Sequence, residues 1–217
     1  MLDKNQKSPF KKIPHKIQYA ICVSGAAGGD TVKLSAHFAE QVGAAIAKKG
    51  HILTTGATVG LPYYAARGAK LAGGVSIGFS PASSIREHLH KYRLPHFYFD
   101  FINYTGLNYV GRDQYLVQSS DAVITIGGRF GSLHEFVTAL EAGKPCGILT
   151  GSGGAADVIP QLMEMLEPPR RSLVVYDDDP ERLVEMITDI LDAESKDIRS
   201  EVSKDEHWFL NPVERNG

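Results

Sequence analysis

Short apolar runs alternate with stretches of helical spacing along most of the chain. The helical spacing is clearest in residues 31–49, where Phe38, Val42 and Ile46 share one face and Gly50 follows the end. The apolar runs predict strands at residues 17–23, 52–55, 75–79, 97–101, 122–126, 146–149 and 173–176. Helices are predicted at residues 31–49, 61–72, 107–119, 132–142, 155–166 and 180–191.

The order of these elements indicates the fold class. Strands that are apolar throughout are covered on both faces, and strands that alternate with helices form parallel sheets. We therefore expect an α/β fold, a doubly wound sheet of about seven mainly parallel strands with helices on both faces. Ligands bind such sheets at the carboxyl ends of the strands, so only a few loops remain to be searched for a site.

The two ends of the chain look accessory to this pattern. Residues 1–15 are rich in lysine and contain two prolines, and residues 194–217 are charged and irregular. We predict a basic N-terminal extension over residues 1–15, one domain over residues 16–193 and a C-terminal tail over residues 194–217.

Composition narrows the class of protein further. The chain has 217 residues, of which 43% are hydrophobic and 22% charged, and its formal net charge is -2. This charge disfavours nucleic acid as a partner. Both cysteines, Cys22 and Cys146, lie in apolar runs and are expected to be buried thiols. No run is long enough for a membrane span and the N-terminus has no apolar signal core, so the cytoplasm is the default location.

Two glycine-containing loops follow the first two predicted strands. Ser24 and Gly25 begin the loop "SGAAGGD", whose amides are suited to an anion or a sugar edge, although a plain turn explains it as well. Its glycine spacing matches neither the dinucleotide fingerprint nor the Walker loop. Gly56 and Gly60 flank the start of the next helix and are small enough for a ligand to approach the backbone.

A third loop, "IGGRFGSLHEF", joins the strand at residues 122–126 to a helix. Ser132 and Glu135 have the spacing of a capping box, in which both side chains only close the helix end. Alternatively, the free amides of the helix N-terminus hold a phosphate, the Ser132 hydroxyl adds a donor, and Glu135 faces the rest of the ligand. The expected phosphate-binding residues are Gly127, Gly128, Arg129, Phe130, Gly131 and Ser132.

Arg112 lies near the start of the helix before that strand, at the same edge of the sheet. Because an arginine there opposes the helix dipole, it is better explained as the partner of an anion.

The histidines give little evidence for a metal site or a catalytic role. His88, His90 and His96 lack a convincing metal-ligand arrangement, so we expect no metal, and His134 is expected to be solvated.

These features together resemble the LONELY GUY family, whose members are often labelled lysine decarboxylases. That family carries an arginine, a Ser-Asp pair eight residues later, an apolar strand and the motif P-G-G-x-G-T-x-x-E. Arg112, Ser120, Asp121 and the segment from Gly128 to Glu135 align with this pattern without a gap. The resemblance covers roughly residues 17–150 and extends to wider relatives that include the molybdenum cofactor carrier protein.

The resemblance implies a Rossmann-like fold, a homodimer, and binding of a nucleoside 5′-monophosphate without a further cofactor. Active members cleave the N-glycosidic bond and release the base and ribose 5-phosphate, and their catalytic Arg and Glu correspond to Arg112 and Glu135. A carboxylate suits this role, because it stabilises an oxocarbenium-like transition state and accepts a proton from water. A non-catalytic nucleotide or molybdenum cofactor carrier is the alternative, and a DNA-processing protein of the same fold is a more distant one.

The chain departs from the family pattern at several positions. Arg129 replaces a motif glycine that is suited to positive φ, so this arginine either binds the phosphate or fills the site. Ser132 replaces threonine and keeps the hydroxyl. Asp113 stands where a lysine is usual, and Pro62 and Tyr63 stand where Met and Gly are typical. Hydrolysis and non-catalytic binding therefore both remain open at this point.

Overall fold

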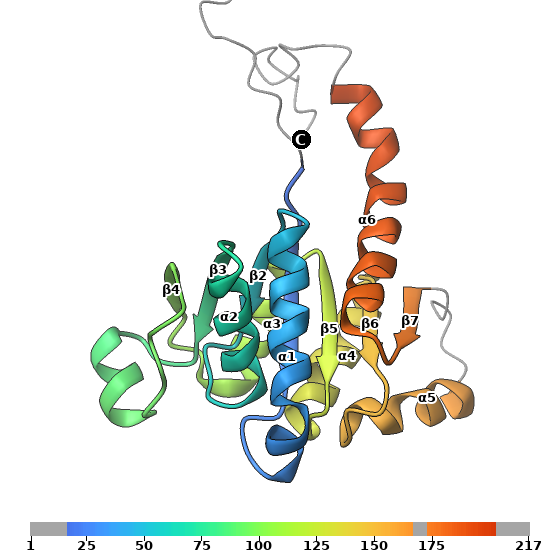
Figure 1. The fold of residues 1–217 in the computed structure, drawn as a ribbon. Helices are drawn as coiled ribbons and strands as arrows, with labels where there is room; N and C mark the ends of the chain where they lie inside the picture. Colours follow the sequence, from blue (N-terminus) through green and yellow to red (C-terminus); the bar gives the residue numbers. More distant parts are fainter. Residues whose placement is uncertain (1–16, 167–172, 203–217) are drawn as a thin grey trace, which may run out of the picture.

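A computed structural model describes residues 17–166 and 173–202, with side chains to residue 196. Seven parallel strands form one sheet in the order β4-β3-β2-β1-β5-β6-β7 (Figure 1). The strands are β1 (Ala20–Gly25), β2 (Ile52–Thr55), β3 (Val75–Ser80), β4 (Phe101–Tyr104), β5 (Ala122–Ile126), β6 (Cys146–Leu149) and β7 (Val174–Asp177). The helices are α1 (Asp30–Lys48), α2 (Leu61–Leu71), α3 (Asn108–Gln118), α4 (Phe130–Glu141), α5 (Ala155–Leu166) and α6 (Pro180–Val202), with a short π-helical turn at Glu87–Lys91.

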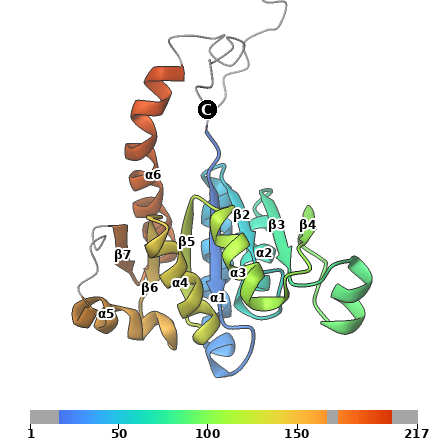
Figure 2. The same ribbon diagram turned by 180° about the vertical axis from the view of Figure 1, so that it is seen from behind.

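Helices cover both faces of the sheet, as the apolar strands predict. Helices α1, α2 and α6 pack on one face and α3, α4 and α5 on the other (Figures 1 and 2). Alternate residues of a strand therefore enter different cores, so Ile124 of β5 packs with α1 and α6 whereas Val123 packs with α4 and α5. The expected Rossmann-like α/β fold is confirmed.

The first strand that the structure describes, β1, lies in the middle of the sheet. β1 pairs with β2 on one side and with β5 on the other, and Gly25 of β1 is in register with Ile126 of β5. The winding direction reverses between these two strands, and a doubly wound sheet binds ligands at such a switch point. The loops after β1 and β5 therefore meet where a site is expected.

Three elements differ from their predicted positions by three residues or more. The first strand was expected at residues 17–23, but β1 spans Ala20–Gly25. The fourth strand was expected at residues 97–101, but it begins at Phe101, because Tyr98 has a positive φ of 64° and the Asp100 carboxylate accepts a hydrogen bond from the Ser76 amide. These contacts make residues 98–100 a turn at the edge of the sheet.

The last helix is longer than predicted, since α6 continues to Val202 past the expected boundary at residue 193. The hydroxyl of Tyr19 bonds both Asp192 and Ser195 at 2.7 Å and ties this extension to the start of the sheet. The expected N-terminal extension and the end of the tail lie outside the described residues. In the described part of the chain, no helix combines the length and the apolar composition needed to cross a membrane.

Glycines allow α1 and α2 to pack at very short range. A Cβ atom at Gly43 would lie 2.0 Å from the carbonyl oxygen of Ala65, and one at Gly68 would lie 1.9 Å from that of Glu40. The small residues of α2 thus bring the helix close to α1.

We expect Gly43→Ala to destabilise the protein by about 1–3 kcal/mol, because the added methyl group overpacks the contact between the two helices. Urea unfolding monitored by circular dichroism measures this change. Gly131→Ala is the matched control, because Gly131 lies in the first turn of α4 and nothing lies within 4 Å of its Cβ position. Equal stability of the two variants would contradict the close helix contact.

Candidate functional site

The connection between β5 and α4 turns on two glycines with positive φ. Gly127 has φ 54° and Gly128 has φ 98°, whereas Arg129 is extended with φ -133°. The Ser152 hydroxyl oxygen accepts a hydrogen bond of 2.7 Å from the Gly127 amide and holds the turn in place. The helix then begins at Phe130, and no side chain caps its N-terminus.

This geometry rules out the capping-box alternative. The N-cap position belongs to Arg129, and Ser132 lies inside the first turn. The carboxyl group of Glu135 accepts a hydrogen bond from the Ser24 hydroxyl at the end of β1, a residue far away in sequence. Glu135 therefore points into the sheet edge and does not reach back to the helix end.

The backbone of Arg129 is free of the strain that its position in a glycine motif suggests. The positive φ values fall on the two preceding glycines, so an arginine fits without cost. Its side chain is exposed and lines an open hollow of about 320 Å³ with Phe130, Leu133 and residues of α5. The Arg129 side chain therefore faces solvent at this hollow, and its role as a phosphate ligand or as a group that fills the site stays a prediction.

Arg112 is buried at the edge of the sheet, with 4% of its surface exposed. Its Nη1 donates a hydrogen bond of 3.1 Å to the carbonyl oxygen of Phe79 at the end of β3. A Cβ atom at Gly56 would lie 1.7 Å from this nitrogen. Gly56, which the sequence offers as a ligand contact, therefore leaves space for the guanidinium group.

The glycines of the first two loops have a similar structural reason. A Cβ atom at Gly60 would lie 2.3 Å from the carbonyl oxygen of Ala26, and one at Gly25 would lie 2.8 Å from that of Ile126. The loops after β1, β2 and β5 therefore hold one another in place. This packing places Ser24 where its hydroxyl reaches Glu135.

Asp113 belongs to the site, although the sequence analysis did not predict it as a site residue. It is 6% exposed and its Oδ2 lies 3.3 Å from Nδ1 of His134, which is therefore not simply solvated. Its Oδ1 lies 3.1 Å from Nε of Arg112, but neither atom is aligned for a hydrogen bond. A sequence signal existed, because Asp113 shares the buried face of α3 with Leu116 and Val117, three and four positions later.

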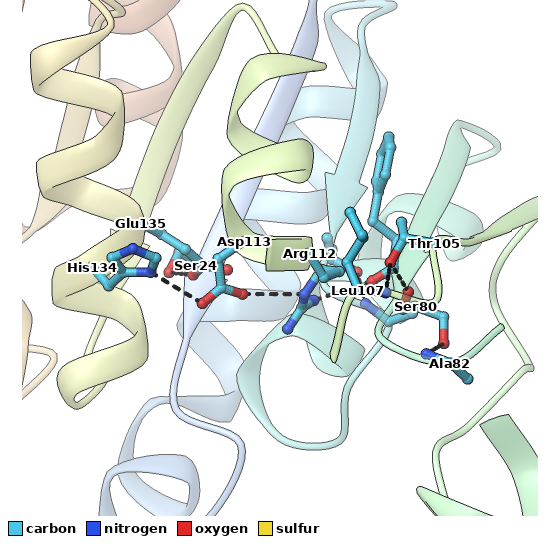
Figure 3. Close-up of polar contacts among 12 residues, drawn as sticks. Ser24, Ser80, Ala82, Thr105, Leu107, Arg112, Asp113, His134 and Glu135 are labelled. Carbon is cyan, nitrogen blue, oxygen red and sulfur yellow. Dashed lines mark hydrogen bonds and ion pairs between the residues drawn. The ribbon is translucent and has the colours of Figure 1, made fainter. Parts of the chain in front are cut away.

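Figure 3 shows the row that these side chains form, with His134, Asp113 and Arg112 joined by dashed lines and with Ser24 and Glu135 alongside. Burial raises the pKa of Glu135 to about 7, Arg112 opposes this effect, and the charge of Asp113 adds to it. Burial also raises the pKa of the nearby Cys22 thiol, which is free, as expected. The cluster thus holds two carboxyl groups, one of which can carry a proton near neutral pH.

Comparison with known proteins agrees with the fold. The profile of the SLOG cluster4 family matches residues 18–184. The chain belongs to the SLOG cluster4 family. An uncharacterized protein of Archaeoglobus fulgidus is 31% identical over 59% of this chain and 76% of its own length.

Two solved structures resemble this SLOG protein over almost their whole length. The molybdenum cofactor binding protein of Rippkaea orientalis has a TM-score of 0.68 and 30% identity, and the match covers 82% of this chain and 99% of that one. The molybdenum cofactor carrier protein of Chlamydomonas reinhardtii has a TM-score of 0.66 and 27% identity, covering 81% and 99%. The predicted place of the chain near the carrier branch is confirmed.

The structure of this SLOG protein brings Arg112, Glu135 and Ser24 together beside the start of α4. His88, by contrast, is buried between the Ser80 hydroxyl and the carbonyl oxygen of Pro95, which explains it without a ligand. Among the described residues, no group of three or more His, Cys, Asp or Glu side chains is placed to hold a metal ion.

We expect Glu135→Gln to flatten the dependence of folding stability on pH between about pH 5 and 7. The folded protein raises the pKa of Glu135 to about 7, so the carboxyl group stabilises the fold at low pH and loses this effect as the pH rises. The wild type should therefore lose up to about 1.4 kcal/mol per pH unit that the variant retains. Urea unfolding at several pH values measures this, with Glu141→Gln at the exposed end of α4 as control. Parallel curves for wild type and Glu135→Gln would contradict the buried, proton-binding state.

Proposed function

We propose that this protein binds a phosphorylated small molecule of the nucleotide class at the carboxyl edge of β1 and β5. The observation that carries the proposal is the N-terminus of α4, which two positive-φ glycines present without a side-chain cap. The amides of a first helical turn lack intrahelical acceptors, and together with the helix dipole they bind phosphate. Ser132 places a hydroxyl in this turn, and open space surrounds the Cβ position of Gly131.

The rest of the ligand would then lie over the cluster of Arg112, Asp113 and Glu135. Both ligands that the sequence suggests, a nucleoside 5′-monophosphate and the molybdenum cofactor, join a phosphate ester to a flat heterocycle. The names of the two solved relatives support the second ligand and a carrier role. The homodimer implied by the family resemblance stays a prediction, which light scattering of the purified protein would test.

We expect AMP to raise the melting temperature of the protein and adenosine to leave it unchanged, because the phosphate supplies the binding energy at α4. Ser132→Ala should weaken AMP binding by about tenfold through the loss of one hydrogen bond to a charged group. Thr138→Ala, further along the same helix, is the control. Equal increases in melting temperature with AMP and adenosine would contradict the proposed phosphate site. The same assay with isolated molybdenum cofactor compares the two ligand classes.

A second candidate function is cleavage of the N-glycosidic bond of the bound nucleotide. The proximity of Glu135 and Arg112 favours it, because the pKa of Glu135 near 7 suits a group that exchanges protons during the reaction. Arg112 is held by the Phe79 carbonyl oxygen and can act on Glu135 or on the departing base.

If the protein is a hydrolase, chromatography of an incubation with AMP should show free adenine. Glu135→Gln should then lower turnover by about 10²-fold or more while AMP binding persists, since acid–base catalysis contributes at least that factor. AMP binding without any release of adenine by the wild type would leave the carrier function as the conclusion.

A further inference from the structure

Asp113 places a second carboxyl group in the buried site, and the proposed function assigns no chemical role to it. Asp113 is 6% exposed and Glu135 is 7% exposed. Both belong to the cluster beside Arg112 (Figure 3), and besides burial, the charge of Asp113 and a side-chain hydrogen bond with it are among the causes that raise the pKa of Glu135. Two ionised carboxylates are both acceptors, so a hydrogen bond between them requires a proton on one of them.

The hydrogen-bond partners of the pair show which group carries this proton. Oδ2 of Asp113 faces His134, but its buried Oδ1 has no hydrogen-bond donor among the described residues. A buried acceptor without a donor is costly, and a protonated Glu135 supplies the missing donor. The Ser24 hydroxyl occupies Oε2 of Glu135, which leaves the other oxygen for the proton.

The charged groups around the pair do not remove the need for a proton. Arg112 contributes one positive charge, but its Nη1 is directed to the Phe79 carbonyl oxygen and its Nε is not aligned with Asp113. His134 contacts the other side of Asp113 with a partly exposed ring. Cys22, beneath the cluster on β1, is a neutral thiol because burial raises its pKa. One arginine thus faces two carboxyl groups.

We propose that Asp113 is a positioning residue that holds a proton on Glu135 when ligand is bound, so that Glu135 meets the ligand as a neutral acid whose proton is shared with Asp113. The inference rests on the proposed function, because the phosphate at the start of α4 adds negative charge one turn away from Glu135. That charge opposes ionisation of the pair. Ligand binding above the titration midpoint of Glu135 is therefore coupled to the uptake of one proton.

The ligand-free protein tests the first half of the proposal. Carbon-13 labelling of the glutamate and aspartate carboxyl groups allows the titration of Glu135 to be followed by NMR. We expect a midpoint near neutral pH in the wild type and a decrease of about one pH unit or more in Asp113→Asn, since one pH unit corresponds to the loss of a single strong charge interaction. Glu141→Gln should leave the midpoint unchanged. An unchanged midpoint in Asp113→Asn would overturn the role of Asp113.

Calorimetry with AMP between pH 7 and 9 tests the second half, because the phosphate is dianionic throughout this range. The affinity of the wild type should fall about tenfold per pH unit above the Glu135 midpoint. Glu135→Gln should bind AMP with pH-independent affinity, because the amide is neutral at every pH and can donate to Asp113 as the neutral acid does. In Asp113→Asn, whose midpoint lies below pH 7, the affinity should already fall about tenfold per pH unit from pH 7 upward.

The outcomes separate this inference from the proposed function. AMP binding that is independent of pH in the wild type, or that is lost at every pH in Glu135→Gln, overturns the inference and leaves the phosphate site intact. Failure of AMP and of isolated molybdenum cofactor to bind at any pH overturns the proposed function, and with it the ligand-bound half of the inference. The NMR titration then still decides whether Asp113 holds the proton in the free protein.

Discussion

The burial of the Arg112 guanidinium group is the constraint on which the site depends. A buried charge is tolerated only when it is paired and hydrogen-bonded. The carbonyl oxygen of Phe79 provides one partner and the adjacent Asp113 provides the counter-charge. Gly56 provides the space, because any side chain there would overlap the guanidinium group. The end of β3 and the loop after β2, both distant from α3 in sequence, are therefore adjusted to a single side chain.

Glycines also set the backbone geometry around the start of α4. Gly127 and Gly128 take the positive φ values, so that the helix begins with free amides and the adjacent arginine remains unstrained. Gly25 and Gly60 let the neighbouring loops pack against this turn. The motif glycines thus serve the backbone geometry of the site, and the groups that a ligand would meet are amides, the Ser132 hydroxyl and the buried charged cluster.

The charged cluster is built into a fold that the chain shares with known proteins. This fold is that of the SLOG cluster4 family, and two relatives of similar fold are a binding protein and a carrier for the molybdenum cofactor. In this chain an aspartate next to Arg112 lies beside Glu135, and two carboxyl groups share a single arginine. Asp113 stands where the LONELY GUY family usually has a lysine, so the charge differs locally at this position while the fold is the same.

Sequence alone determined the sheet, six helices and the loops that surround the site, because apolar runs and helical spacing are local properties of the chain. The resemblance to the LONELY GUY family also implied a pairing of Arg112 with Glu135. The apolar pattern misplaced the fourth strand, whose start depends on contacts of Asp100 with a neighbouring strand. Only the tertiary structure showed that Ser24 reaches Glu135, that Gly56 accommodates Arg112 and that Asp113 faces both His134 and Glu135. These contacts join elements that are separate in sequence, and their geometry exists only after the sheet has brought its strand ends together.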